Sequence, residues 1–368
     1  MKTFINILKW IVGLLFIFSG LVKANDPLGL SYKMLEFFEA WGWHFMDNYT
    51  LYAAVAMNVC EVMAGVALLI SWQIKFFNWF LLALISFFTY LTAYVLFSGK
   101  IKECGCFGDC IPLSGTNTFL KDLILLIMIL ILLFNSKYIK RVLILNLSII
   151  IILVSIIFTI GLQIYVLRHL PLVDCLPYKK GNNIQEQMKI PAGAVPDSFT
   201  IVFQYRKNEE IIEFDKNHFP NNFDSTYIFQ NRIDKLVRKG NAEPAILDFS
   251  LHTLNGRDTT DFILNQKCVL LLLKDLDTPI RLWQDDVYRI DFLCIEKKIP
   301  FYIVTALPDQ VIPIFNSAHF TILRADATVL KTAARVQPTY MLLDKGTIKA
   351  KYSFADIVKF EKESGILP

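Results

Sequence analysis

The sequence carries little charge: only 19% of its 368 residues are Asp, Glu, Lys or Arg, and the formal net charge is +4. The positive residues form no basic cluster, so no nucleic acid partner is expected. Hydrophobic residues make up 54% of the chain, and the mean hydropathy is +0.45. This excess of apolar side chains excludes a disordered chain and argues against a single soluble enzyme domain. The composition predicts a membrane protein in contact with the lipid bilayer.

Nearly all long apolar runs lie before residue 168. A spanning helix needs roughly 20 mostly apolar residues. The first run has the features of a secretory signal as well, but it is long for a signal core. We therefore predict an α-helical transmembrane bundle over residues 1–168. Its five expected spans cover about 3–22, 49–71, 76–98, 118–135 and 142–167.

Lysine and arginine residues in the short loops indicate the orientation of the bundle. Lys2, Lys75 and the positive group at 137–141 lie on one side, which is therefore predicted to be cytoplasmic. Five spans then place the C-terminal half in the periplasm, as in a multi-pass protein of the inner (cytoplasmic) membrane. The segment 27–45 is too polar to span and is expected to lie along the outer face as an interfacial helix. Whether the chain forms an oligomer or joins a larger membrane complex stays open.

The loop between the third and fourth predicted spans holds Cys104, Cys106 and Cys110 within seven residues. On the oxidising side of a membrane, such thiols form disulfides or cycle through them. Three cysteines cannot all pair with one another, so one thiol stays free unless Cys175, expected near the same surface, takes it. In one interpretation, a free thiolate beside a disulfide performs thiol exchange.

A second interpretation of these cysteines is structural: a disulfide from Cys104 or Cys110 to Cys175 pins the loop to the soluble half. The sequence leaves the two interpretations open. A metal or iron–sulfur site built from the same cysteines fits their spacing poorly, so no metal is expected.

Glu61 interrupts the second predicted span. A carboxyl group there must face the bundle interior, be protonated, or pair with a partner such as Asn58, Lys23 or Lys121, which makes it a functional candidate. The alternative is a helix-packing group that hydrogen-bonds a neighbouring helix. The adjacent Cys60 is expected to behave as a small buried hydrophobe.

Three features of the first half together resemble the DoxX-like and MauE-like membrane proteins. They are the stretch 18–27 (FSGLVKANDP), the segment 61–65 in the second span, and the Cys-x-Cys-Phe-Gly loop. The resemblance covers about residues 1–135. MauE-like proteins are accessory factors in methylamine utilisation that are thought to help form disulfides in a periplasmic dehydrogenase, and DoxX-like proteins are linked to quinone-dependent oxidation. The resemblance implies a thiol or quinone redox role, with Glu61 handling a proton or lining a quinone pocket, and it does not imply a methylamine pathway.

The soluble half begins with residues 169–242, which are predicted as a linker and a small β region. Two alternating runs at 199–205 and 211–214 indicate a β-hairpin insert. Residues 243–368 are predicted as an α/β domain, because apolar strands alternate with a helix, as in a sheet covered on both faces. These elements are expected at 268–273, 280–298 and 301–304, followed by a final hairpin from Val336 onward.

The segment 336–348 resembles the final hairpin of thioredoxin-fold domains of the TlpA type, and the resemblance covers about 243–366. It implies that Pro338 follows a cis bond and, with Gln337, shapes a partner-binding edge. That fold carries Cys-x-x-Cys after its central strand, but residues 274–279 contain no cysteine. The thioredoxin-like domain is therefore predicted to lack dithiol chemistry and to bind periplasmic proteins or dock over the cysteine loop.

The remaining reactive residue types form no motif. Cys268 and Cys294 fall at apolar positions and are expected to be packed thiols. The histidines are scattered, and neither a Ser/His/Asp order nor a phosphate loop is detectable. Four of the five, His169, His218, His252 and His319, are interpreted as ordinary surface or cap residues.

Two functions follow from these features. The leading one is a membrane redox accessory protein that exchanges disulfides with periplasmic proteins through Cys104, Cys106 and Cys110, with Cys175 as resolving thiol. The alternative is a non-enzymatic scaffold or assembly subunit, whose redox-silent domain binds periplasmic partners while the disulfides act as staples.

Overall fold

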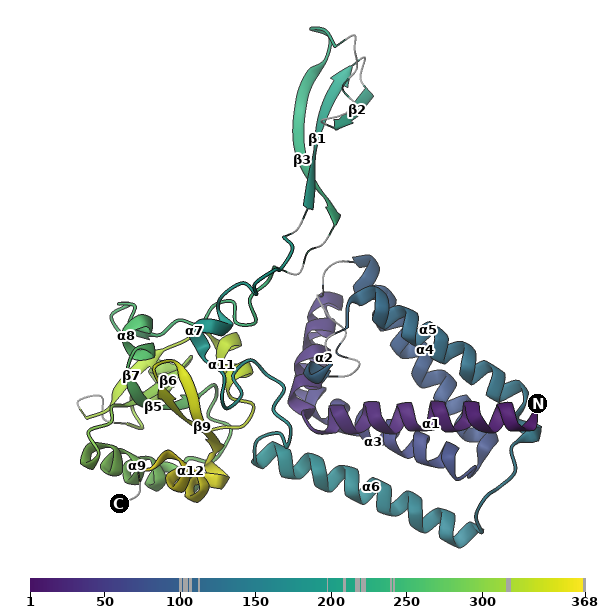
Figure 1. The fold of residues 1–368 in the computed structure, drawn as a ribbon, viewed down its shortest axis with the longest axis horizontal. Coiled ribbons are helices and arrows are strands. Elements are labelled where there is room, and N and C mark those ends of the chain that lie inside the picture. The colour runs from purple at the N-terminus through teal and green to yellow at the C-terminus, as the bar shows by residue number, and fades with distance from the viewer. Residues whose placement is uncertain are drawn as a thin grey trace.

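The structure is a computed structural model that describes residues 1–98, 101, 105, 108–111, 113–196, 198–207, 210–215, 219, 223–238, 240, 242–315 and 319–366. It has three parts: a helical bundle, a narrow β-sheet that projects away from the rest, and an α/β domain beside one end of the bundle (Figure 1).

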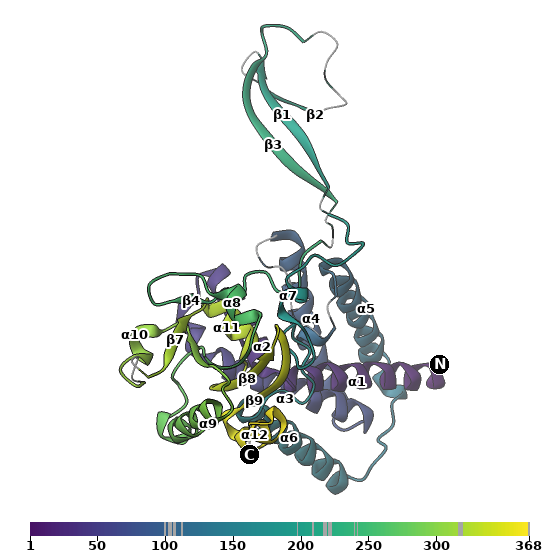
Figure 2. The same cartoon turned by 60° about the vertical axis from the view of Figure 1, so that its left-hand side comes forward.

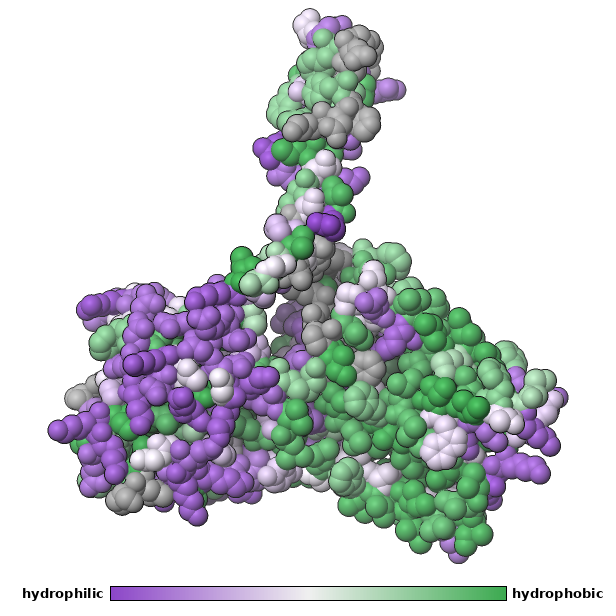
Figure 3. All heavy atoms as spheres, viewed as in Figure 1, coloured by the Kyte–Doolittle hydropathy of each residue, from purple (hydrophilic) through white to green (hydrophobic). Residues whose placement is uncertain are grey.

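Five helices of the bundle are long and apolar enough to cross a membrane. Because hydrocarbon offers no hydrogen-bond partners, a segment that spans it must satisfy its own backbone groups, which a helix does. Their surfaces are strongly hydrophobic, in contrast to the hydrophilic α/β domain (Figure 3). The five predicted spans are confirmed, with boundaries within about three residues. They are α1 (Lys2–Ala24), α3 (Thr50–Leu69), α4 (Ile74–Ser98), α5 (Gly115–Phe134) and α6 (Leu145–Arg168).

Helices α1 and α3 approach each other closely at two glycines. A Cβ atom on Gly65 would lie 2.7 Å from the carbonyl oxygen of Gly13 and 3.0 Å from the backbone nitrogen of Ile17. Small residues allow such contact between membrane helices. The contact fixes the register of the two helices and brings Lys23, near the end of α1, beside Glu61 in α3.

Helix α2 (Pro27–Trp41) runs across the end of the bundle, transverse to α1 (Figure 1). Asp26 caps it by accepting a hydrogen bond from the Gly29 backbone at 3.0 Å, and Pro27 takes the first helical position. A short 3₁₀ helix, His44–Tyr49, then leads into α3. We call this end of the bundle, where α2 and Cys110 lie, the cysteine end.

The α/β domain contains a six-stranded sheet in the order β4-β7-β6-β5-β8-β9. Strands β5, β6 and β7 are parallel, whereas β8 is antiparallel to β5 and β9. The strands are β4 (His252–Thr253), β5 (Lys267–Leu273), β6 (Phe301–Thr305), β7 (Thr321–Arg324), β8 (Thr339–Asp344) and β9 (Thr347–Ser353).

Both faces of this sheet are covered, as the apolar run at 268–273 predicted. Alternate residues of β5 enter two separate cores: Leu270 and Leu272 pack on one face, and Val269 and Leu271 on the other. Helices α9 and α12 cover the face of Val269, and α7, α8 and α11 cover the opposite face (Figure 2). The helices are α7 (Ile184–Gln187), α8 (Thr260–Leu264), α9 (Gln284–Glu296), α10 (Pro308–Val311), α11 (Ala327–Ala333) and α12 (Ile357–Ser364).

The projecting sheet consists of β1 (Ser198–Lys207), β2 (Glu210–Asp215) and β3 (Ile228–Arg238), in the order β2-β1-β3. We call it the β arm. The predicted hairpin corresponds to β1 and β2, whereas the sequence interpretation missed β3. Consecutive polar and charged residues interrupt the apolar ones in β3, so its sequence lacks the alternation that identifies a strand.

Candidate functional site at the cysteine end

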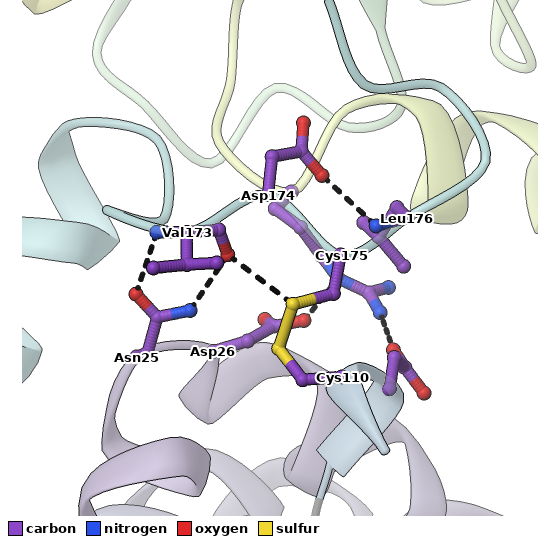
Figure 4. The surroundings of a disulfide bond; sticks show 9 residues. Asn25, Asp26, Cys110, Val173, Asp174, Cys175 and Leu176 are labelled. Atoms are coloured by element: carbon purple, nitrogen blue, oxygen red, sulfur yellow. Dashed lines mark hydrogen bonds and ion pairs between the residues drawn. A yellow bond between two sulfur atoms is a disulfide. The ribbon is translucent and has the colours of Figure 1, made fainter. Parts of the chain in front are cut away.

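A disulfide joins Cys110 to Cys175, 65 positions apart in the sequence (Figure 4). Cys110 belongs to a short 3₁₀ turn between α4 and α5, and Cys175 follows the end of α6. The side chain of Asn25 holds the same segment, donating to the Val173 carbonyl at 2.9 Å and accepting from its amide at 3.1 Å. The structure thus brings two of the predicted cysteines together, whereas Cys104 and Cys106 lie outside the described residues.

Arg335, just after α11, connects the α/β domain to two segments of the bundle through ion pairs. Its Nε donates to Asp26 Oδ2 at 2.8 Å, and its Nη2 donates to Asp109 Oδ2 at 2.5 Å. Burial acts to lower the pKa of Arg335, but the charges of Asp26 and Asp109 outweigh it and raise the pKa. Since Asp26 caps α2 and Asp109 precedes Cys110, one guanidinium connects the α/β domain to α2 and to the cysteine loop. We call these three residues the Arg335 clamp.

Further polar contacts surround the Arg335 clamp. Lys351, buried in β9, donates to Asp174 at 2.8 Å, next to Cys175. Its pKa is lowered because burial disfavours the charged form more than Asp174 favours it. Lys274 donates to the Tyr32 hydroxyl of α2 at 2.9 Å. The α/β domain is therefore docked on the cysteine end through charged and hydrogen-bonded side chains.

A cleft of about 710 Å³ opens between α2 and the α/β domain. Cys175, one half of the disulfide, lines this cleft, whereas Cys110 does not. A molecule that enters the cleft therefore comes next to the Cys175 end of the disulfide. Other residues of the wall are Tyr32, Glu36, Asp109, Lys331 and Arg335.

Inside the bundle, Glu61 is 1% exposed and forms an ion pair with Lys23, which is equally buried. Of the three partners predicted for Glu61, the structure pairs Lys23 directly with it, and Lys121 lies on the wall of the same small pocket. Asn58 instead donates to Gln163 of α6 at 3.0 Å, and Lys121 lies 2.9 Å from its neighbour Asp122. The paired charges satisfy the requirement that an acid in the membrane face the interior.

An apolar cavity of about 120 Å³ lies beside this ion pair, between α2, α3 and α4. Lys23 forms part of its wall, with its Nζ 4.5 Å from the centre of the Phe88 ring. Gly105, the residue between Cys104 and Cys106, lines the same cavity. The remaining wall is mostly aromatic and aliphatic, including Met34, Phe37, Trp41, Met57, Phe87 and Leu91.

Thiols in the α/β domain are unsuited to exchange. Burial raises the pKa of both Cys268 and Cys294 to about 12, so their reactive thiolate forms are scarce at neutral pH. Cys60, in α3, is a free thiol that is partly buried. Among the residues that the structure describes, no group of three or more His, Cys, Asp or Glu side chains is arranged to hold a metal ion.

The bond between Gln337 and Pro338 is cis, as the resemblance implied. Both residues are buried. The Gln337 side chain accepts from the Lys274 amide at 2.5 Å, and its carbonyl accepts from the Thr278 hydroxyl at 2.9 Å. These bonds fix the segment 274–279, where the two cysteines are missing, and a partner-binding role for Gln337 and Pro338 stays a prediction.

Among the described residues, three of the chain's five histidines lie within ion-pair distance of an aspartate. His169 lies 2.7 Å from Asp356, His319 lies 2.6 Å from Asp291, and His44 lies 3.6 Å from Asp47. His218 lies outside the described residues. The first pair adds a contact between the end of α6 and the α/β domain.

Sequence reasoning missed Arg335 and Asp109 altogether, and it cited Asp26 only as part of a motif. Arg335 has no periodic or motif signal, and 226 residues separate it from Asp109. The one available signal was the Asn-Asp-Pro sequence after the first span, which combines a helix cap with a proline at the start of α2.

The fold and the site define a multi-pass membrane protein with a disulfide-bonded loop beneath an α/β domain. Residues 1–135 match the family described as methylamine utilisation protein MauE, so they form a MauE-like membrane domain. Residues 199–239, which contain the β arm, match a domain of unknown function, DUF8463. No curated protein and no solved structure matches the chain.

Proposed function

We propose that this protein is an inner-membrane redox accessory protein that oxidises thiols of periplasmic proteins through its cysteine loop and passes the electrons to a quinone. One observation carries the proposal: Gly105, flanked by Cys104 and Cys106, lines an apolar cavity that also contains the buried Lys23.

The positive residues and the disulfide support the proposed orientation. Lys2, Lys75 and the group at 137–141 favour a cytoplasmic location for the opposite end of the bundle. A disulfide at the cysteine end is typical of an oxidising compartment, which supports a periplasmic location for the α/β domain.

Thiol exchange would begin at Cys175, which lines the cleft. A client thiolate attacks this sulfur, forms a mixed disulfide and displaces Cys110 as a thiolate. A second client thiolate then attacks the client sulfur, which leaves Cys175 reduced and the client oxidised. Overall, a client dithiol loses two electrons and two protons, and the chain gains a dithiol. A Cys104–Cys106 disulfide would then oxidise the Cys110/Cys175 dithiol by the same exchange, and the resulting Cys104/Cys106 dithiol would reduce the quinone to quinol as its own disulfide forms again.

The apolar cavity fits the ring of a quinone, which would supply a two-electron acceptor when bound. Its wall is largely aromatic and aliphatic, with two cationic side chains, Lys23 and Lys33, and the buried Lys23 would donate a hydrogen bond to a quinone oxygen. Glu61, paired with that lysine, would hold or release a proton in this otherwise apolar setting.

A thioredoxin-like identity for the α/β domain is supported by the parallel β7-β6-β5 core, by the antiparallel β8-β9 pair and by the cis bond before β8. Because its Cys-x-x-Cys is missing, the domain would position clients over the cleft.

The scaffold alternative is supported by a specific observation: the Cys110–Cys175 disulfide and the Arg335 clamp join the two halves, as structural staples would.

Quinone reduction in nanodiscs tests the proposal. Wild-type protein given a reduced dithiol protein and a quinone is expected to form quinol, and Cys175→Ser is expected to lower the rate to background because the attacked sulfur is gone. Cys294→Ala, which removes a buried thiol far from the cleft, should keep the wild-type rate. Equal rates for wild type, Cys175→Ser and protein-free nanodiscs would overturn the redox function and favour the scaffold.

A further inference from the structure

The β arm exposes an unusual amount of apolar surface for a sheet of three strands. Five of its side chains are each more than half exposed: Phe199, Ile211, Ile228, Phe229 and Val237. No second layer of described residues covers either face of the arm, and hydrophobic patches are visible along it (Figure 3). Small isolated sheets are marginally stable in water, and exposed apolar patches mark surfaces that bind a partner or a membrane.

Aromatic residues are concentrated toward the tip of the arm. Tyr205 lies at the centre of the group, with ring-to-ring distances of 5.0 Å to Phe223 and 5.6 Å to Phe229. Lys207 lies over the Tyr227 ring at 4.0 Å. Tyrosine and other aromatic rings favour the boundary between lipid and water, where one end is apolar and the other is hydrated. The group also includes Phe203, Phe214 and Phe219.

The position of the arm indicates which surface it meets. It leaves the molecule at the cysteine end and runs transverse to the spans, as α2 does (Figures 1 and 2). An element with this direction at the end of a spanning bundle lies along the membrane surface, whereas an element that continued the direction of the spans would point into water. The direction of the arm therefore favours a position along the headgroup layer rather than in water.

We propose that the β arm lies on the lipid headgroup layer at the cysteine end, with its aromatic tip inserted among the lipids. The arm then anchors the linker to the bilayer and limits the rotation of the α/β domain above the bundle. This inference rests on the spans and on the arm alone, and it is independent of the redox chemistry.

Photo-cross-linking of the purified full chain in nanodiscs of phosphatidylcholine and phosphatidylglycerol tests this arrangement. The photoreactive residue p-benzoyl-phenylalanine replaces Phe229 or Phe223 in the arm, and mass spectrometry identifies what each peptide has captured. Phe158, 59% exposed on the span α6, serves as the lipid-facing reference, and Phe262, 67% exposed on α8 of the α/β domain, serves as the water-facing control. At each of the four positions, the substitution replaces an exposed or half-exposed phenyl ring with a slightly larger aromatic group.

Lipid adducts at Phe229 and Phe223 are expected at a yield at least about tenfold above that at Phe262 and comparable to Phe158. Lipid yields at both arm positions that equal the Phe262 value, while Phe158 captures lipid, would overturn the proposal. Capture of a second copy of the chain in place of lipid would also overturn it, because the arm would then be a contact between copies.

Discussion

Replacing Arg335 with methionine is expected to release the α/β domain from the cysteine end. Methionine keeps most of the side-chain volume but leaves the carboxylates of Asp26 and Asp109 without their shared cation. Breaking a buried ion pair in this way costs about 3–5 kcal/mol, and the lower end applies here because Asp109 is one-third exposed. Hydrogen exchange at the α2 amides, measured with Cys110–Cys175 reduced, should accelerate relative to wild type.

Arg232→Met provides the matched control for the Arg335 clamp. Arg232 pairs with Asp234 on the β arm, but both side chains are more than half exposed, so the pair contributes little. Exchange at α2 should be unchanged in this variant. If Arg335→Met also left exchange at α2 unchanged, the clamp would not be what holds the two halves together.

Replacing Lys23 with methionine is expected to destabilise the bundle by about 3–5 kcal/mol, because Glu61 is then left as a buried carboxyl without its cation. The double variant Lys23→Met with Glu61→Met should recover most of this loss, since two apolar side chains replace the pair in an apolar setting. Unfolding in mixed micelles, followed by circular dichroism, measures both changes.

The partly exposed Lys33–Glu36 pair on α2 supplies the control for this cycle. Lys33→Met should change stability by no more than about 0.5 kcal/mol. A double variant as unstable as Lys23→Met alone would contradict the role of the buried pair, because the loss would then come from packing at position 23.

The parts of the fold that could be predicted are those set by a strong local constraint. Lipid requires long apolar helices, so hydropathy located all five spans. A sheet covered on both faces requires a continuous apolar strand, so the run at 268–273 identified β5. The third strand of the β arm was missed because its pattern of Arg232, Asp234 and Lys235 becomes a strand only through pairing with β1.

The candidate site was only half predictable, because its contacts join distant segments. The sequence placed Glu61 inside a span and offered three partners, but only the packing of α1 on α3 at Gly13 and Gly65 selects Lys23. It likewise placed Cys175 near the cysteine loop without deciding its partner. The role of Arg335 could not be predicted, because nothing in the sequence around a single arginine indicates which carboxylates it contacts in the fold.

Differential thiol trapping of the protein in native membranes tests the central claim, that the cysteines at the cysteine end change redox state during function. Free thiols are alkylated first, disulfides are then reduced and alkylated with a second reagent, and each site is identified by mass spectrometry. The account predicts that a reduced dithiol client converts Cys110 and Cys175 to thiols and that added quinone restores the disulfide. Cys268 and Cys294 should be labelled only after unfolding. A Cys110–Cys175 disulfide that stays intact throughout, with Cys104 and Cys106 also unchanged, would contradict the claim and identify the disulfide as a structural staple.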